Sequence, residues 1–228
     1  MLAIVIPAYN EEASLEAVLN DLKRQVRSAE IIVVDDGSKD KTSQIAKKIG
    51  ATVCRHVVNR GLGAALATGI QCAIGEGADI IVTFDADLQH EPKDIFRLIK
   101  PIQDGTADVV LGSRFLVKRH ILLMPHIKRL GNWALTWITN VLAGTNITDS
   151  QCGLRAFDRK AAKRLMILCD RYEVSSEIVH ELGRHRLKVV EVPIKAIYDE
   201  RSKIKGTNIG SGFQIFFGLL MKRWGLKR

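Results

Sequence analysis

Residues 80–89 read IIVTFDADLQ, a short apolar run that ends abruptly in acidic and amide side chains. A continuous run of β-branched residues predicts a strand buried on both faces, which is typical of a parallel sheet covered by helices. Two similar runs precede it, LAIVI over residues 2–6 and IIVV over residues 31–34, and segments with helical periodicity separate the runs. This alternation predicts a single α/β domain with a doubly wound, mostly parallel sheet.

The same periodicities give the remaining elements. In the first half, further strands are expected at residues 52–58 and 109–111, and helices at residues 12–26, 41–49, 62–74 and 91–104. In the less regular second half we expect a loop at 115–130, a helix at 131–143, a strand at 153–157, helices at 158–169 and 176–185, strand at 187–197 and an apolar helix at 209–224. The predicted domain spans residues 1–205, and residues 206–228 form a basic and apolar C-terminal helix that faces a membrane.

Composition narrows the choice of partner. The chain has 34 Lys and Arg against 25 Asp and Glu, a formal net charge of +9. Such an excess favours a polyanion, either nucleic acid, an acidic membrane surface or a phosphorylated small molecule. Nucleic acid is disfavoured, because the aromatic residues are not interleaved with Lys and Arg on a strand and no nucleic-acid-binding motif is present.

Cysteines and apolar runs indicate the compartment. The four cysteines have neither CxxC nor zinc spacing, which favours reduced thiols in the cytoplasm. No secretory signal is recognised, and the longest apolar stretches fall short of the roughly 20 residues of a spanning helix. Apolar residues 121–124 and 213–221 are bordered by basic side chains, which suits an anionic leaflet. We therefore expect peripheral attachment to the cytoplasmic face of the membrane; packing of the terminal helix against the domain or another subunit is the alternative.

Polar and charged residues follow the carboxyl ends of four predicted strands, where open parallel sheets bind their ligands. These groups are Pro7–Glu11, Asp35–Ser38, Asp85–Gln89 and Gly112–Arg114. One acidic strand end alone is more often a turn or a helix cap, but four at one edge favour a binding site. No GxGxxG follows the first strand and no GxxxxGK[ST] occurs, which disfavours a dinucleotide oxidoreductase or a P-loop ATPase.

Two carboxylates in this set have the spacing of a metal site. Asp85 and Asp87 are two residues apart, so their side chains share one side of an extended segment. Carboxylate oxygens suit Mg²⁺ or Mn²⁺, and Gln89 adds a neutral oxygen. We favour this metal site over a solvated acidic loop. Asp36 has the place of a carboxylate that binds a base or ribose, although it could also only turn the chain into the next helix.

Six segments follow one another along the chain: IPAYNE (6–11), VVDDGSKDKT (33–42), NRGLGAAL (59–66), FDADLQH (84–90), GSR (112–114) and TDSQCGLRAF (148–157). Together they resemble the inverting family 2 glycosyltransferases with a GT-A fold, a Rossmann-like sheet flanked by helices. Within that family they look most like the polyprenyl-phosphate and dolichyl-phosphate sugar synthases. The resemblance implies metal-dependent transfer of a sugar from a nucleotide sugar to a polyprenyl or dolichyl phosphate.

The resemblance also implies roles for individual residues. The nucleotide-sugar site would comprise Pro7, Tyr9, Glu11, Val34, Asp36, Asp85, Ala86, Arg201 and Lys203, and the metal ligands Asp87, Gln89 and Asp85. The SQCG form of residues 150–153 favours UDP-glucose or UDP-N-acetylglucosamine over GDP-mannose as donor. A relative that extends a saccharide in glycan or cell-wall synthesis is the alternative.

A lipid phosphate is already dianionic near neutral pH, so it needs positioning and charge neutralisation rather than a general base. Arg114 and Arg129 are the candidates for holding that acceptor phosphate, although Arg129 belongs to a basic cluster that could be a solvated face. The catalytic candidates are Asp87, Arg114 and Asp149, and Asp149 could instead cap the following turn. Glu177 is expected on a helix surface, and His56 is assigned no role.

Overall fold

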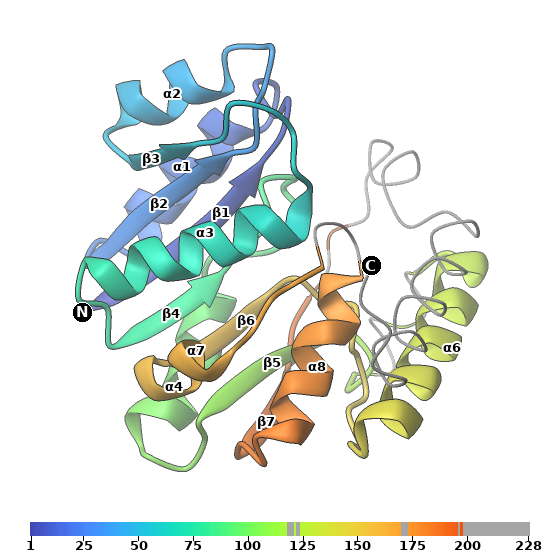
Figure 1. Ribbon diagram of the computed structural model, residues 1–228. Helices are drawn as coiled ribbons and strands as arrows, with labels where there is room; N and C mark the ends of the chain where they lie inside the picture. Colours follow the sequence, from blue (N-terminus) through green and yellow to red (C-terminus); the bar gives the residue numbers. More distant parts are fainter. Residues whose placement is uncertain (118–120, 122–123, 170–172, 196, 198–228) are drawn as a thin grey trace.

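The computed structural model describes residues 1–117, 121, 124–169, 173–195 and 197 (Figure 1). The helix expected over residues 209–224 lies outside the described residues, as do Arg201 and Lys203. A seven-stranded sheet crosses the molecule in the order β3-β2-β1-β4-β6-β5-β7. The strands are β1 (Leu2–Ala8), β2 (Ala29–Asp35), β3 (Thr52–Arg55), β4 (Ile80–Thr83), β5 (Val109–Ser113), β6 (Arg155–Asp158) and β7 (Val189–Pro193).

Strand direction sets where the site lies. β1 pairs in parallel with β2 and β4, and β5 pairs in parallel with β7. β6 runs antiparallel to both β4 and β5, which therefore point the same way. The carboxyl ends of β1, β2, β4 and β5 consequently share one edge of the sheet, as the sequence predicted. Arg155, the first residue of β6, lies at that edge between Thr83 and Leu111.

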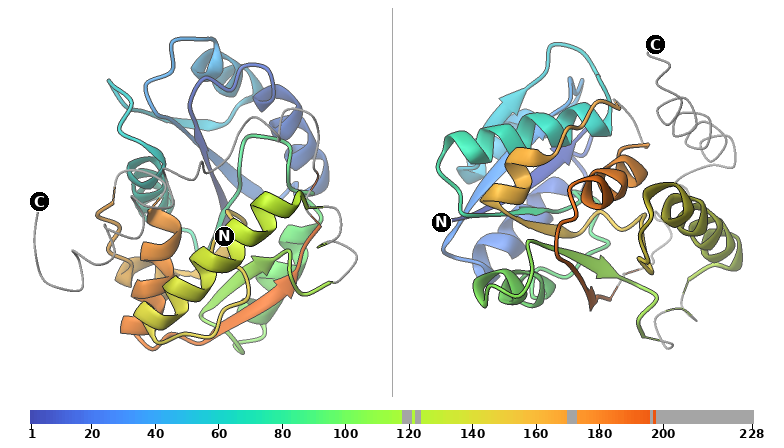
Figure 2. Two further views of the ribbon diagram at one scale, coloured as in Figure 1. Left: turned by 90° about the vertical axis from the view of Figure 1, so that its right-hand side faces the viewer. Right: turned by 60° about the horizontal axis from the view of Figure 1, so that its bottom comes forward.

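Helices cover both faces of the sheet (Figure 2). They are α1 (Leu15–Gln25), α2 (Thr42–Ile49), α3 (Leu62–Gly75), α4 (Asp94–Gln103), α6 (His126–Ala143), α7 (Arg159–Arg164) and α8 (Val174–Arg184). Successive residues of a strand face opposite sides, so β1 contributes to two cores. Ile4 and Ile6 pack with α1, α2 and α4, whereas Ala3 and Val5 pack with α3, α7 and α8. The predicted doubly wound arrangement is confirmed.

Several element boundaries differ from the sequence prediction; α7, for example, ends at Arg164 rather than at residue 169. Two further differences have a visible cause. β3 ends at Arg55 rather than at residue 58, because its pairing with β2 stops where Asp35 lies opposite Arg55. The next residue, His56, then turns towards Asp36, and Val57 is almost fully exposed. α6 begins at His126 rather than at residue 131, directly after Pro125. The end of β3 thus coincides with a tertiary contact, whereas the start of α6 coincides with a proline.

α3 packs closely on the sheet at Gly69. A Cβ at this position would collide with Val5 and lie 2.9 Å from Val34 Cγ2. Gly69→Ala is therefore expected to destabilise the fold by about 1–3 kcal/mol, although alanine normally favours a helix. Gly75→Ala in the same helix is the matched control, because nothing lies within 4 Å of its added Cβ. Thermal unfolding should show a lower midpoint for the first variant only; equal midpoints would contradict this packing.

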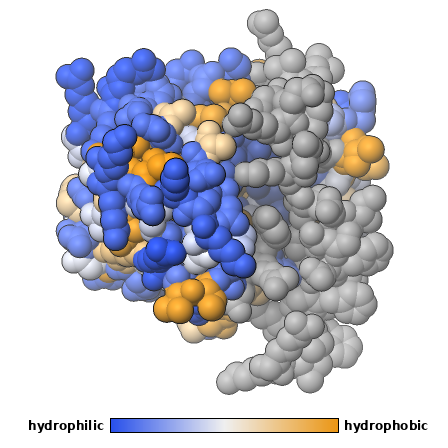
Figure 3. Space-filling view, turned by 90° about the horizontal axis from the view of Figure 1, so that it is seen from above, coloured by the Kyte–Doolittle hydropathy of each residue, from blue (hydrophilic) through white to orange (hydrophobic). Residues whose placement is uncertain are grey.

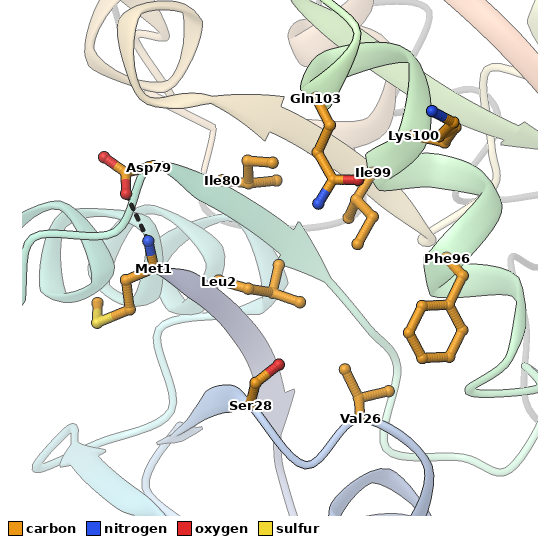
Figure 4. Close-up of a pocket in the computed structure, with 10 residues that line it drawn as sticks. All are labelled: Met1, Leu2, Val26, Ser28, Asp79, Ile80, Phe96, Ile99, Lys100 and Gln103. Carbon is orange, nitrogen blue, oxygen red and sulfur yellow. Dashed lines mark hydrogen bonds and ion pairs between the residues drawn. The ribbon is translucent and has the colours of Figure 1, made fainter.

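The described surface is mostly hydrophilic when viewed from above, with apolar residues in small separate patches (Figure 3). Among the described helices, none is long and apolar enough to cross a membrane. A cavity of about 570 Å³ lies at the other end of the sheet, where β1 and β4 begin (Figure 4). Leu2, Ile80 and Phe96 contribute to its largely apolar lining, which includes none of the site residues predicted from the sequence. This cavity is therefore not the candidate site.

Candidate active site

Hydrogen bonds join the loop after β1 to the loop after β2. Within the sheet, Pro7 of β1 lies opposite Val34 of β2. Beyond it, Ser38 Oγ accepts a hydrogen bond from Asn10 N at 2.9 Å, and Thr42 Oγ1 accepts one from Glu11 N at 2.9 Å. Together these contacts bring Pro7, Glu11 and Val34 to one end of the β1–β2 pair. Tyr9 extends from the same loop and is 43% exposed, so its ring is accessible to a ligand.

Asp36 organises the glycine-rich loop before α3. Its side chain is buried, and its two carboxylate oxygens accept hydrogen bonds from Arg60 N at 2.9 Å and Gly61 N at 2.7 Å. His56 Nδ1 lies 2.7 Å from Asp36 Oδ1, and His56 Nε2 lies 2.9 Å from Thr68 Oγ1. Asp36 therefore holds the loop that leads into α3. Its contact with a base or ribose stays a prediction. The role of His56 could not be predicted from the sequence, because its partners come together only in the fold.

The carboxylates after β4 have opposite pKa shifts. Burial tends to raise the pKa of Asp85, but the 3.1 Å contact with His90 and the charges of Arg155 and Arg114 outweigh it and lower the pKa. Burial and the neighbouring Asp85 charge raise the pKa of Asp87 to about 6. Asp87 accepts hydrogen bonds from Gln89 N at 3.0 Å and Gln89 Nε2 at 2.6 Å. Two close carboxylates thus leave excess negative charge at this strand end.

That excess charge fits a divalent cation. Asp87 and Asp85 would hold it through carboxylate oxygens, and Gln89 would contribute its amide oxygen. The described residues contain no group of three or more His, Cys, Asp and Glu side chains that could hold a metal ion unaided. Mg²⁺ is commonly held by only one or two carboxylates together with substrate phosphates, so the donor set agrees with a cation that binds along with a diphosphate.

A buried ion pair joins β5 to the loop before β6. Arg114 donates to both carboxylate oxygens of Asp149, from Nε at 2.7 Å and from Nη2 at 2.8 Å, and its backbone N donates to Oδ2 at 3.1 Å. Burial alone would raise the pKa of Asp149, but the Arg114 charge and hydrogen bonds hold the pKa below its usual value. The Asp149 side chain is completely buried and that of Arg114 is 14% exposed. Asp149 thereby orients Arg114. A catalytic role for either residue stays a prediction.

Further residues that the sequence did not single out support this pair. Glu191 of β7 accepts hydrogen bonds from Thr148 N at 2.9 Å and Asp149 N at 3.2 Å. Arg155 is buried and donates from Nη2 to Ser150 O at 3.2 Å. A Cβ at Gly153 would overlap the Asp85 carboxylate, so only glycine allows this loop to approach Asp85 so closely.

The structure brings most, but not all, of the predicted residues together. Asp85, Asp87 and Ala86 follow β4, and the charges of Glu11 and Arg114 act on this carboxylate pair. Arg129 is on α6, where its Nη2 lies 2.8 Å from His126 Nδ1. This contact of Arg129 lies within α6 and not at the strand-end cluster. The expectation for Glu177 is wrong: it is fully buried, and its carboxylate accepts hydrogen bonds from Leu168 N and Cys169 N.

Residues 3–166 match Glycosyl transferase family 2, and the chain belongs to this family. It is 50% identical to an uncharacterized protein of Methanocaldococcus jannaschii, over 96% of this chain and 91% of the relative. It is 41% identical to the UDP-N-acetylglucosamine–dolichyl-phosphate N-acetylglucosaminyltransferase of Methanococcus voltae, over 99% and 97% of the two chains.

Solved structures agree with the fold. The crystal structure of glucosyl-3-phosphoglycerate synthase from Mycobacterium tuberculosis in complex with UDP has a TM-score of 0.75 at 21% identity, covering 100% of this chain and 81% of that chain. The structure of the same enzyme with Mn²⁺, UDP and phosphoglyceric acid has a TM-score of 0.73 at 21% identity, covering 100% and 80%. The predicted GT-A fold and family are therefore confirmed.

Proposed function

We propose that this protein transfers a sugar from a UDP-sugar to a polyprenyl or dolichyl phosphate, with inversion at the sugar carbon and with Mg²⁺ or Mn²⁺ bound. The observation that carries the proposal is the strand edge itself, where the charge of the Asp149-oriented Arg114 acts on Asp85, and the charge of Asp85 acts in turn on Asp87. Negative and positive groups are thus paired at the place where a diphosphate must leave and a phosphate must attack. UDP-N-acetylglucosamine is the first donor to test, because the Methanococcus voltae relative is named for it.

The donor binds along the ends of β1, β2 and β4. Tyr9 offers an exposed ring on which a base can stack, beside Pro7 and Val34. Asp36 holds the Arg60–Gly61 loop beside this end of the sheet, and Glu11 lies near enough to Asp87 to influence its charge. Arg201 and Lys203 complete the donor site as basic partners of the diphosphate. Asp85 and Asp87 would hold a divalent cation at this place, and such a cation would offset the negative charge of the departing nucleoside diphosphate.

The acceptor needs no proton to be removed. The second pKa of a phosphate monoester is about 6, so the attacking oxygen is anionic at neutral pH. That oxygen forms a bond to the sugar carbon while the bond from this carbon to the diphosphate breaks, and the nucleoside diphosphate keeps the electron pair. Arg114 faces this phosphate as a planar cation already fixed by Asp149, and Arg129 is a second candidate contact. The reaction takes place at the cytoplasmic face of a membrane, to which the protein is peripherally attached.

Transfer of radiolabel tests the proposal directly. The full chain is incubated with Mg²⁺ or Mn²⁺, a short-chain polyprenyl phosphate and, in turn, labelled UDP- and GDP-sugars. We expect label from a UDP-sugar to enter the organic phase and EDTA to abolish the transfer. Label that moves only onto a saccharide acceptor would support the alternative family 2 activity and contradict the lipid acceptor.

A further inference from the structure

Helix α6 directs its apolar side away from the protein. It lies at the right-hand edge of the molecule in Figure 1, crosses the front of the left view of Figure 2, and packs against α8. The side chains that it buries most completely are two threonines, Thr136 and Thr139. A surface helix of a globular protein normally buries its apolar stripe and exposes polar residues. α6 partly buries Leu135, Ile138 and Leu142 as well, but it leaves a second set of large apolar side chains exposed.

The outward side of α6 is a continuous apolar stripe. Its members are spaced three or four residues apart, so they share one helical face. Each is between 59% and 79% exposed, and they are Ile127, Leu130, Trp133, Trp137 and Val141. Elsewhere, in the view of Figure 3, apolar residues form small separate patches on a hydrophilic surface. A stripe of this length, with two tryptophans at its centre, is the kind of surface that contacts a partner.

Hydrogen bonds to the active-site loop hold α6 in this orientation. Ser150 N donates to Thr136 Oγ1 at 3.2 Å, and Asn140 exchanges hydrogen bonds with Ile147, donating to its O at 2.8 Å and accepting from its N at 2.9 Å. Asp149, which orients Arg114, lies between these two anchor points. The polar side of α6 thus supports the Arg114–Asp149 pair, and the apolar side is left facing outward.

The charge of the surrounding sequence favours an anionic partner. Residues 109–148 contain no Asp or Glu, yet they include Arg114, Lys118, Arg119, Lys128 and Arg129. Tryptophan is enriched at membrane–water interfaces, because its ring is apolar and its N–H remains able to hydrogen-bond. An apolar stripe with tryptophans, in a segment that has only positive formal charges, suits the headgroup region of an anionic bilayer.

We propose that α6 lies in the plane of an anionic lipid bilayer, with its five-residue apolar stripe inserted among the headgroups. The proposal rests on the proposed function for one consequence only: docking through α6 brings the phosphate of a membrane-bound acceptor to the side of the protein that carries Arg114. It adds a contact surface that the sequence did not predict, since the sequence indicated residues 121–124 and 213–221 instead.

Vesicle co-sedimentation tests the proposal with the full chain. The vesicles contain phosphatidylcholine and phosphatidylglycerol in a 3:1 ratio, or phosphatidylcholine alone. We expect binding to the anionic vesicles, and Trp137→Glu should weaken it about tenfold or more, because a large apolar side chain is replaced by a charge. Phe96→Glu on α4 is the matched control: it also replaces a half-exposed aromatic residue on a helix, and it should change binding less than twofold. Circular dichroism verifies that both variants are folded.

Tryptophan emission gives a second readout. In a Trp224→Phe background, only Trp133 and Trp137 fluoresce, and vesicles should shift their emission to shorter wavelength. Unchanged emission, equal vesicle binding by Trp137→Glu and wild type, or equal binding to both vesicle types would each overturn the proposal. A stripe covered by a second copy or by another part of the chain would give unchanged emission together with a lower unfolding midpoint for Trp137→Glu. Transfer by wild type to a short-chain acceptor without vesicles reports on the proposed function separately.

Discussion

Asp149→Asn is expected to lower both the stability and the activity of the protein severely. The substitution removes the charge that compensates the largely buried Arg114, and breaking a buried ion pair on one side costs about 3–5 kcal/mol. It also releases the guanidinium from its two-point contact. Misplacement of a positioned group by about 1 Å can cost about 100-fold in rate, and we expect a loss of at least that size. Thermal unfolding and label transfer measure the two effects.

The same ion pair has a defined pH dependence. Because the folded-state pKa of Asp149 is lowered, its contribution is complete above the usual aspartate pKa and is lost as the pH falls through the folded value. Asp149→Asn should therefore lose less stability than wild type on acidification. Asp104→Asn is the control, since its salt bridge with Lys100 is solvent-exposed and contributes little. If Asp149→Asn unfolded at the wild-type temperature, the Arg114–Asp149 pair would not be the structural centre of this site.

Asp87→Asn should abolish transfer and yet stabilise the metal-free fold. The amide keeps the shape of the side chain but removes a ligand charge, for which we expect a loss of activity of about 100-fold or more. Burial and the Asp85 charge raise the pKa of Asp87 to about 6, so at pH 7 the ionised carboxylate costs the folded state about 3 kcal/mol. This destabilisation of the folded state develops as the pH rises from the ordinary aspartate pKa to the raised pKa of Asp87 in the folded protein.

Activity and stability should thus change in opposite directions in this variant. Unfolding is measured at pH 7 in EDTA, where the Asp87→Asn midpoint should lie a few degrees above wild type. Asp21→Asn on α1, which removes a surface carboxylate, should leave label transfer unaltered. Full activity of Asp87→Asn would remove this residue from the metal site.

The sheet and its functional edge could be predicted because they depend on local patterns. Residues 2–6, 31–34 and 80–84 are apolar enough to be strands buried on both faces, and parallel strands necessarily collect their carboxyl-terminal residues at one edge. The structure accordingly brings Asp85 within electrostatic reach of both Asp87 and Arg114.

The contacts that organise the site could not be predicted in the same way. Asp36, His56 and Arg60 meet only because β2, β3 and the loop before α3 pack together. Glu177 has a polar side chain on an amphipathic helix, which normally indicates exposure; its partners are backbone N–H groups of the preceding segment. α6 exposes an apolar stripe that surface helices normally bury, and its hydrogen bonds to residues 147–150 form only in the fold.

Crystals grown with MnCl₂ and UDP, and measured at the manganese absorption edge, test the central claim most directly. These crystals would reveal whether the strand edge binds a nucleoside diphosphate through a cation on Asp87. We expect an anomalous peak beside the Asp87 carboxylate, in contact with the diphosphate, and the UDP base next to Tyr9. UDP bound with no anomalous peak near Asp85 or Asp87, or bound in the cavity beside Leu2 and Phe96, would contradict the account.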